Sequence, residues 1–420
     1  NNAAPKVAMT IGAGAATLAM KAGETATLSF VFTQDPGTTF TVNDISVVGG
    51  GNITNLTKVD ATHYTATYTP PALTTGISTL NIASSSFANI VNLSNIDGAD
   101  SDNTVTVSVD TQVPTVNITG PSTVVKAGET PTITFNFSED PGTSFTVADV
   151  VVTGGGSLSG LAGTGTTRTA IYTPLANSIT PVNFGIASNT FQDAAGNPNA
   201  DGGELNNYFN LSIDTVRPTV AVSTSKSLTG EGEDLILTFT FSEDPGTSFT
   251  IDDIVLTHTG TATTGTFNGI TGSGTTRQVK YLPDAGETGT TTFSVASDKF
   301  TDPTGNLNKD GADTDNRVLV NVDTIDPVAP SRPLVSDNVW PIGQTGTGVH
   351  DGNIGSGNGG LYGTRTDDIT PTFYGNAGAV EANATVSVYD NGALIGSVVA
   401  AADGSWSYTH GSACLLYTSP

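Results

Sequence analysis

Hydrophobic residues in this chain alternate with polar ones over short stretches. Ile133, Phe135 and Phe137 are separated by threonine and asparagine, and the stretch Leu235–Phe241 has the same alternation. A period of two predicts β-strands with one buried and one solvated face. Val182–Ile186 and Phe209–Ile213 predict later strands of the same kind. Turn-forming residues recur every 8–12 positions, as in an all-β sandwich, and no window shows a helical period.

The pattern occurs three times. The segment Phe30–Ile45 recurs as Phe135–Val150 and again as Phe239–Ile254, at spacings of 105 and 104 residues. Self-similarity at a fixed period indicates tandem structural units. Each unit closes on an aspartate at the same position of the repeat, namely Asp110, Asp214 and Asp323.

Each unit therefore holds roughly seven short strands in about 105 residues, which predicts a two-sheet Greek-key sandwich. After Asp323 the pattern changes: prolines at 327, 330, 333 and 341 are followed by a glycine-rich stretch, Ile342–Gly363, and then by further strand-like segments, with a hairpin turn expected at Asn391–Gly392. The predicted domains are residues 1–109, 110–213 and 214–322, then a partial sandwich of another subtype over 323–412. The final residues, 413–420, fit none of these patterns and resemble a cloning scar.

Charge and composition narrow the function classes. The formal charge is −25, which disfavours nucleic acid and anionic membranes as partners and suits a site that collects cations. The single cysteine, Cys414, permits no intrachain disulfide, and no apolar run approaches the ~18 residues of a membrane span. The first residues show no export signal, so we expect either a cytosolic chain or a piece of a larger exported one.

A sequence signature adds a resemblance to a known family. The second and third units share an FSE turn, an FT-x-x-D strand start, a strand ending in TP or LP, and D-x-x-G-N before the last strand, as in Asp193–Asn197. This signature resembles the bacterial immunoglobulin-like (Ig-like) repeats of giant surface adhesins and biofilm-associated proteins. The first unit matches it in a degenerate form, and the segment Thr366–Thr409 looks like another Ig-like repeat of such proteins.

The resemblance implies an all-β fold of tandem immunoglobulin-like Greek-key β-sandwiches arranged head to tail. It also implies an extracellular location at the bacterial cell surface, where such repeats form a stalk. In an Ig-like sandwich, the loop between the second and third strands, the loop before the last strand and the start of the first strand lie at one end. We call the first two loops the B–C and F–G loops.

That geometry predicts two oxygen-rich clusters, one where each unit meets the next. The candidate ligands at the first are Asp110, Glu139, Asp140, Asp193 and Asn197, and those at the second are Asp214, Glu243, Asp244, Asp302 and Asn306. Hard oxygen ligands without histidine or cysteine favour Ca²⁺. The alternative is that these are hydrated turn residues. At the matching positions the first unit has Gln34, Asp35, Asn89 and Leu93, which predicts a lost site.

Other acidic residues have two interpretations each. Asp44, Asp149 and Asp253 either cap backbone amides, which we favour, or add ligands. Runs around Asp97 and Asp310 either hold further Ca²⁺ or form hydrated loops, and Asp367 and Asp368 are candidates for the junction into the fourth domain. Trp340 and Trp406 are expected in cores rather than stacked on sugars.

Catalysis has little support in the sequence. The four histidines lack a zinc-binding or Ser-His-Asp context, and carboxylate pairs that recur in every unit are unlike an active site, which is normally built once. We therefore expect a non-catalytic stalk of a surface adhesin, stiffened by Ca²⁺ and supporting adhesion or biofilm formation. Its expected partners are neighbouring domains of the chain and host or biofilm glycans or proteins. The alternatives are a glycan-binding or homotypic adhesive module, and accessory domains of a large secreted hydrolase.

Overall fold

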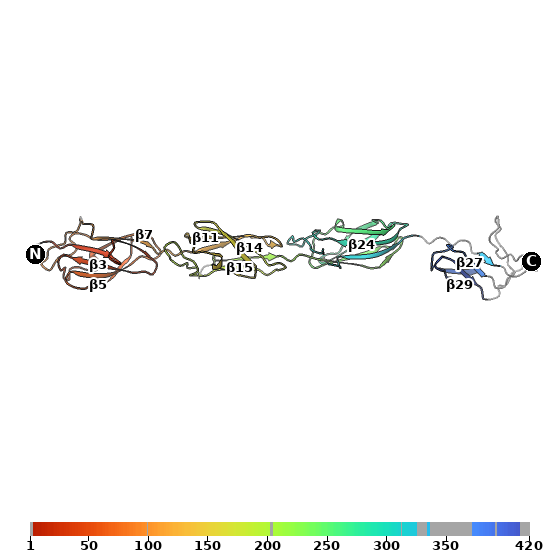
Figure 1. Cartoon of the computed structure of the whole chain (residues 1–420), viewed down its shortest axis with the longest axis horizontal. Coiled ribbons are helices and arrows are strands. Elements are labelled where there is room, and N and C mark those ends of the chain that lie inside the picture. The colour runs from red at the N-terminus through yellow and green to blue at the C-terminus, as the bar shows by residue number, and fades with distance from the viewer. Residues whose placement is uncertain are drawn as a thin grey trace, which may run out of the picture. The chain divides into compact units, whose positions relative to one another are not determined.

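The computed structural model describes residues 3–98, 100–201, 205–311, 313–325, 334–336, 372–390 and 393–411 (Figure 1). The glycine-rich stretch, Trp340, Asp367, Asp368 and the tail 413–420 lie outside these residues. Two compact units contain the described chain. The first comprises Asn1–Val220 with Phe241–Phe249 and Ala296–Ala312, and the second comprises Ala221–Thr240, Thr250–Val295 and Asp313–Pro420.

The first repeat is a sandwich of two four-stranded sheets. One sheet has the order β1 (Val7–Ile11), β3 (Ala26–Phe32), β6 (His63–Thr69), β5 (Asn52–Lys58). The other has the order β2 (Thr17–Lys21), β8 (Thr104–Asp110), β7 (Thr75–Ile82), β4 (Ile45–Val48). Because several neighbours, such as β1 and β3 or β4 and β7, are not consecutive in sequence, the chain crosses between sheets as in an immunoglobulin domain.

The second repeat has the same topology in its larger sheet. That sheet has the order β13 (Ser157–Ala162), β14 (Thr167–Thr173), β11 (Thr132–Phe137), β9 (Val116–Thr119). Opposite it lie β12 (Val150–Thr153), β15 (Val182–Ile186) and β16 (Tyr208–Leu211). A short parallel pair, β10 (Val125–Lys126) with β17 (Ile213–Asp214), continues this second layer.

The third repeat again has two four-stranded sheets, in the second compact unit for most of their length. Their orders are β18 (Val220–Thr224), β20 (Leu235–Phe241), β23 (Thr276–Leu282), β22 (Thr266–Thr271), and β19 (Leu228–Thr229), β25 (Arg317–Asp323), β24 (Thr288–Val295), β21 (Ile254–Gly260). Tyr281 of β23 and Phe293 of β24 meet edge to face at 4.8 Å between ring centroids, so the sheets share a core.

Described strands after residue 325 form two further small sheets. They are β26 (Leu334–Ser336), β27 (Thr372–Gly375) and β30 (Trp406–Thr409), and the pair β28 (Thr385–Asp390) with β29 (Ala393–Val399). Trp406 is 7% exposed and packs in a small core, as expected. The turn predicted at Asn391–Gly392 lies outside the described residues.

The fold confirms the predicted all-β class of tandem Ig-like sandwiches. The strand number differs from the roughly seven expected, because the first and third repeats each have eight strands and the second has nine. The leading segment of the first repeat forms two strands: β1 pairs antiparallel with β3, and β2 pairs parallel with β8 in the other sheet. One leading segment therefore hydrogen-bonds to both sheets. No helix in the described part of the chain has the length and apolarity to cross a membrane.

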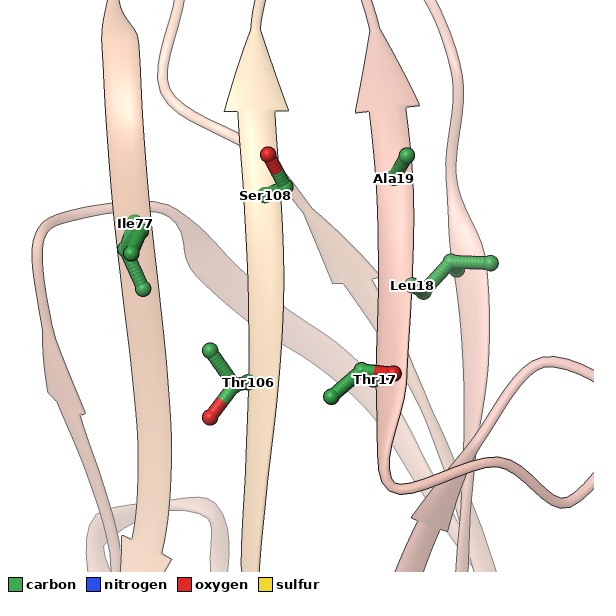
Figure 2. Close-up of a pocket in the computed structure, with 6 residues that line it drawn as sticks. All are labelled: Thr17, Leu18, Ala19, Ile77, Thr106 and Ser108. Atoms are coloured by element: carbon green, nitrogen blue, oxygen red, sulfur yellow. The ribbon is translucent and has the colours of Figure 1, made fainter.

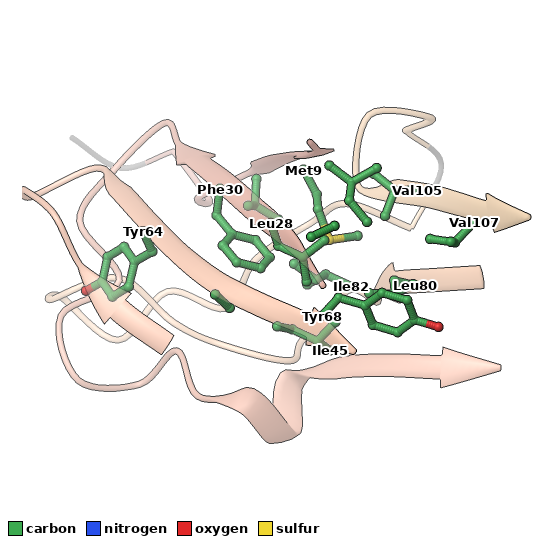
Figure 3. Packing of buried hydrophobic residues seen from close by; sticks show 14 of the residues in the cluster. Met9, Leu28, Phe30, Ile45, Tyr64, Tyr68, Leu80, Ile82, Val105 and Val107 are labelled. Atoms are coloured by element: carbon green, nitrogen blue, oxygen red, sulfur yellow. The ribbon is translucent and has the colours of Figure 1, made fainter. Parts of the chain in front are cut away.

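The alternating residues of the strands build each core. In the first repeat Leu28, Phe30 and Tyr68 of one sheet meet Leu80 and Val107 of the other (Figure 3). All five are fully buried. Burial of such side chains stabilises a fold by roughly 1.5–3 kcal/mol each, so these alternating positions dominate folding.

Each core is also pinned by a buried Asn-x-Asp element in the F–G loop. In the first repeat Asp97 is fully buried and accepts the backbone N–H of Val7 at 2.8 Å and the amide of Asn95 at 2.6 Å. Asp201 and Asp310 accept the N–H groups of Val116 and Val220 in the same way. The interpretation of Asp97 and Asp310 as parts of hydrated loops or calcium sites is thus replaced by a structural role.

The capping roles favoured for three aspartates are confirmed. Each ends a short 3₁₀ turn, Val42–Asp44, Val147–Asp149 or Ile251–Asp253, and each accepts the backbone N–H of a threonine three residues earlier at 2.6–2.7 Å. These carboxylates satisfy amides that a turn would otherwise leave unpaired.

Replacing Asp97 with alanine should loosen the start of the first repeat. Two buried donors would lose their acceptor, at a cost of about 1–3 kcal/mol each. Hydrogen exchange followed by mass spectrometry should show faster exchange in Val7–Ile11. Asp102→Ala, which removes an exposed carboxylate of the same loop region, should leave that exchange unchanged. Equal protection in both variants would contradict the pinning role.

Candidate metal centre

The structure gathers three carboxylates at each of two places. The first group is Asp110, Glu139 and Asp193, and the second is Asp214, Glu243 and Asp302. In each group the three side chains offer oxygen atoms that lie within 4.8 Å of one another. Both groups lie in the first compact unit, and we call them the first and second carboxylate clusters.

Three separate segments build each cluster. Asp110 is the last residue of β8, Glu139 lies in the B–C loop after β11, and Asp193 lies in the F–G loop after β15. In the second cluster Asp214 ends β17, while Glu243 and Asp302 occupy the corresponding loops of the third repeat. Each cluster thus joins the last strand of one repeat to two loops of the next.

Aromatic packing holds the two loops of each cluster in place. Phe137, two residues before Glu139, meets Phe191, two residues before Asp193, edge to face at 5.2 Å between ring centroids. Phe145 closes the group at 4.8 Å from Phe137. In the third repeat Phe241 lies 5.0 Å from Phe300 in the same manner. The rings fix the spacing of the loops, so the carboxylates are brought together by the core beneath them.

Asn197 connects the first cluster to the preceding repeat. Its amide donates to the carbonyl oxygen of Asp110 at 2.9 Å and to Oδ2 of Asp193 at 2.8 Å, and its own Oδ1 accepts the N–H of Ala22 at 2.8 Å. Asn306 repeats this with Asp214, Asp302 and Ala127 at 3.0, 2.8 and 2.7 Å. Both asparagines are buried, at 0% and 3% exposed.

The proximity of the carboxylates is electrostatically unfavourable. Two unit charges 4.8 Å apart repel by about 3 kcal/mol at an effective dielectric constant of 20. Among the described residues, none of the six carboxylates forms an ion pair with lysine or arginine. Burial, with the charges of Asp110 and Asp193, raises the pKa of Glu139 to about 6. Burial, with Asp214 and Asp302, also raises the pKa of Glu243.

The donor set fits a hard divalent cation. Ligand oxygens bound to one Ca²⁺ at 2.3–2.6 Å lie no more than about 5 Å apart, and the cluster oxygens meet that limit. Backbone N–H and amide groups occupy part of the oxygens of Asp193 and Asp302, which orients these side chains. Asp110, Glu139 and Asp193 would hold the first ion, and Asp214, Glu243 and Asp302 the second.

The structure separates some residues that we expected together. Asp140 turns away from Glu139 and forms an ion pair with Arg168 at 3.0 Å, because that guanidinium lies on the neighbouring strand β14. Asp244 also lies outside the second cluster and accepts the N–H of Gly246 at 2.9 Å. The structure therefore brings three of the five expected ligands together as carboxylates at each cluster. The oxygens of Asn197 and Asn306 serve the contact to the preceding repeat.

The first repeat replaces the carboxylates with amides. Asn89 donates from its amide to Oε1 of Gln34 at 2.9 Å, and Gln34 donates to the carbonyl oxygen of Ala3 at 2.7 Å. Neutral groups that hydrogen-bond to one another need no cation. Two neutral amides therefore stand in the first repeat where the other repeats have the cluster carboxylates.

A pocket and two histidines in the described part of the chain lie outside any group of three carboxylates. A depression on the first repeat is lined by residues of β2, β7 and β8, namely Thr17, Leu18, Ala19, Ile77, Thr106 and Ser108 (Figure 2). It holds no titratable group. His63 pairs with the exposed Asp60, whereas His258 contacts Thr291, so the histidines belong to different repeats and environments.

Comparisons with known proteins give a family match. The sequence profile of the family described as bacterial Ig-like domain matches residues 1–108, 110–209 and 214–319. No curated protein matches the chain.

Solved structures of similar fold include three bacterial proteins. The Escherichia coli adhesin FdeC is 17% identical over 76% of this chain and 96% of its own, with a TM-score of 0.34. Invasin, described as a bacterial integrin-binding protein, is 10% identical over 80% of this chain and 63% of its own, with a TM-score of 0.32. InvD of Yersinia pseudotuberculosis is 14% identical over 75% and 96%, with a TM-score of 0.27.

The raised pKa of Glu139 predicts the pH dependence of the metal-free chain. Its folded-state pKa of about 6 lies above the ordinary glutamate value of 4.5, so the folded state binds more protons between these values. Stability is then greatest below pH 4.5 and is lost as the pH rises through 6. In the presence of a chelator, the wild type should unfold at a higher temperature at pH 5 than at pH 7. The pH profile of Glu139→Gln gives the contribution of the remaining carboxylates, which is subtracted from the wild-type profile.

Glu139→Gln carries no titrating group at this position, so it should flatten that dependence. A wild-type pH profile that coincides with the profile of Glu139→Gln would contradict the electrostatic account of the cluster.

Proposed function

Because the chain belongs to the bacterial Ig-like domain family, in three tandem copies, we propose that it is a non-catalytic extracellular stalk of a bacterial surface adhesin. In this proposal Ca²⁺ binds at the first and second carboxylate clusters and couples each repeat to the next. The stalk supports adhesion or biofilm formation by holding a binding domain away from the cell.

One observation carries the calcium part of the proposal. Each cluster takes its carboxylates from two consecutive repeats, and no lysine or arginine among the described residues neutralises them by an ion pair. A divalent cation removes the repulsion between the carboxylates only when the repeats are held together. Binding energy is thereby converted into a restraint on the joint. Extracellular modules bind Ca²⁺ at about 10⁻⁴–10⁻³ M, which suits the calcium level outside cells.

The composition supports the structural part of the proposal. The chain has one cysteine and thus no internal disulfide, and it carries a net charge of −25. Such a chain gains rigidity from core packing and from bound cations. The partners in this proposal are the neighbouring repeats, and at the cell surface host or biofilm glycans or proteins bound by other parts of the adhesin.

A glycan array with the full chain should therefore give no binding.

Calcium titration by calorimetry tests the metal part directly. Asp193→Asn and Asp302→Asn each remove the buried carboxylate of one cluster, so each should abolish one binding event of the full chain. Asp140→Asn is the matched control: it changes the same charge beside Glu139, at a residue that pairs with Arg168. Heat signals that are identical in all four proteins would rule out calcium at these clusters.

Distance measurements test the restraint on the joint. Spin labels at Thr54→Cys in β5 and Ser159→Cys in β13, in a chain with Cys414→Ser, should report a narrower distance distribution with calcium than with chelator. Asn197→Ala, which removes the hydrogen bonds to Ala22 and Asp110, should broaden the distribution in chelator further. A distribution of the same width with and without calcium would remove the stiffening role.

A further inference from the structure

The third repeat has an acidic group that the first two repeats lack. Thr263 Oγ1 lies 2.7 Å from Oδ2 of Asp284 and in very close contact with Oε1 of Glu287. Asp284 is exposed, whereas Glu287 is only 4% exposed. We call these three residues the Asp284–Thr263–Glu287 corner. They lie together in the second compact unit and share no residue with either cluster.

Hydrogen bonds to a buried threonine identify the equivalent positions in the other repeats. Thr324 Oγ1 accepts the N–H of Glu287 and donates to the carbonyl oxygen of Asp284. Thr111 makes the same two bonds with Thr74 and Pro71, and Thr215 makes them with Ser178 and Leu175. Glu287 therefore replaces a small hydroxyl residue, and Asp284 replaces an apolar one.

The loop that contains Thr263 also differs from the equivalent loops of the first two repeats. In the first two repeats Tyr68 and Tyr172 donate their hydroxyls to glycine carbonyls, those of Gly50 and Gly155. A side chain there would meet Pro71 or Leu175 within 3.3 Å. In the third repeat Tyr281 donates to the carbonyl oxygen of Thr263 at 3.4 Å, so a hydroxyl residue stands where the glycine was. The apolar contact of the other repeats has become a group of oxygens.

The corner has one side-chain donor, and no lysine or arginine among the described residues forms an ion pair with its two carboxylates. The hydroxyl of Thr263 has one proton and lies between two carboxylate oxygens, so it can donate to only one of them. Oε2 of Glu287 is shielded from water and has no hydrogen-bond partner. Leaving such an oxygen unpaired is costly, more so when the group is charged.

A proton alone does not complete the group. A proton on Oε1 of Glu287 could be donated to Thr263, but Oε2 would still have no partner. A cation bound by both oxygens of Glu287 leaves neither unpaired. It would reach them from the side of Asp284, which is exposed to solvent.

We infer that the Asp284–Thr263–Glu287 corner binds one hard divalent cation, of the Ca²⁺ and Mg²⁺ class. Glu287 binds it from the protein side, Asp284 binds it from the solvent side, and the oxygens of Thr263 and water complete the coordination. Two carboxylates with several water ligands suit Mg²⁺, whereas the bidentate carboxylate and extra oxygens suit Ca²⁺. The inference does not depend on the carboxylate clusters.

Ion counting on the full chain tests the inference. Equilibrium dialysis against Ca²⁺ alone, and separately against Mg²⁺ alone, gives the number of ions bound by each protein. Glu287→Gln is expected to bind one ion fewer than the wild type for at least one of the two metals. Asp284→Asn should weaken that site about tenfold or more, because affinity depends on the charge of the ligands. The metal whose count falls identifies the ion.

Matched controls separate this site from the clusters. Asp252→Asn removes an exposed charge of the same repeat and should leave the count unchanged. In a chain that carries Asp193→Asn and Asp302→Asn, the ion at the corner should remain and should then be lost with Glu287→Gln. A failure of the clusters and a failure of the corner therefore give different counts.

Folding of the variants is checked by circular dichroism. Asp284 is exposed, so Asp284→Asn reports on the site even if Glu287→Gln disturbs the fold. Equal counts and equal affinities for both metals in wild type, Glu287→Gln and Asp284→Asn would overturn the inference.

Discussion

At each joint a buried asparagine side chain positions the polar groups of the first compact unit. The amide of Asn197 has a partner for each of its hydrogen-bonding groups: the Asp110 carbonyl, the Asp193 carboxylate and the Ala22 N–H. It therefore fixes the F–G loop of one repeat against the last strand and a turn of the repeat before it. The cluster of carboxylates is assembled only because this asparagine and the aromatic rings beneath it set its position.

The three repeats show how the same sandwich accommodates different polar chemistry at its ends. The strands and the aromatic core recur, since apolar burial supplies the stability that each repeat needs. The loops differ in charge: Gln34 and Asn89 form a neutral pair in the first repeat, whereas Glu139 and Asp193 form a charged group in the second. The loop before β24 of the third repeat differs again, with Glu287 in place of a small hydroxyl residue. A loop position can change from neutral to charged without altering the sheets.

Buried carboxylates in this chain fall into two physical classes. Asp97, Asp201 and Asp310 are pinned by backbone and asparagine donors. The cluster carboxylates face one another, and burial together with the charges of the neighbouring carboxylates raises the pKa of Glu139 and Glu243. Burial alone does not distinguish the classes. The closeness of a second carboxylate does, which makes the clusters and Glu287 the candidates for a cation.

The sequence by itself determined the repeat period, the alternating strands and the all-β class, because a period of two and a fixed spacing are local properties of the chain. It also identified most of the cluster residues, since loop positions repeat in register with the strands. Only the tertiary structure separated Asp140 from Glu139, because the position of Arg168 on β14 depends on strand pairing. Likewise Asn197 was expected as a ligand, and only the contact with Ala22, 175 residues away, gave its oxygen another partner. Hydrogen-bond partners distant in sequence decide what a polar side chain does, and no local pattern contains them.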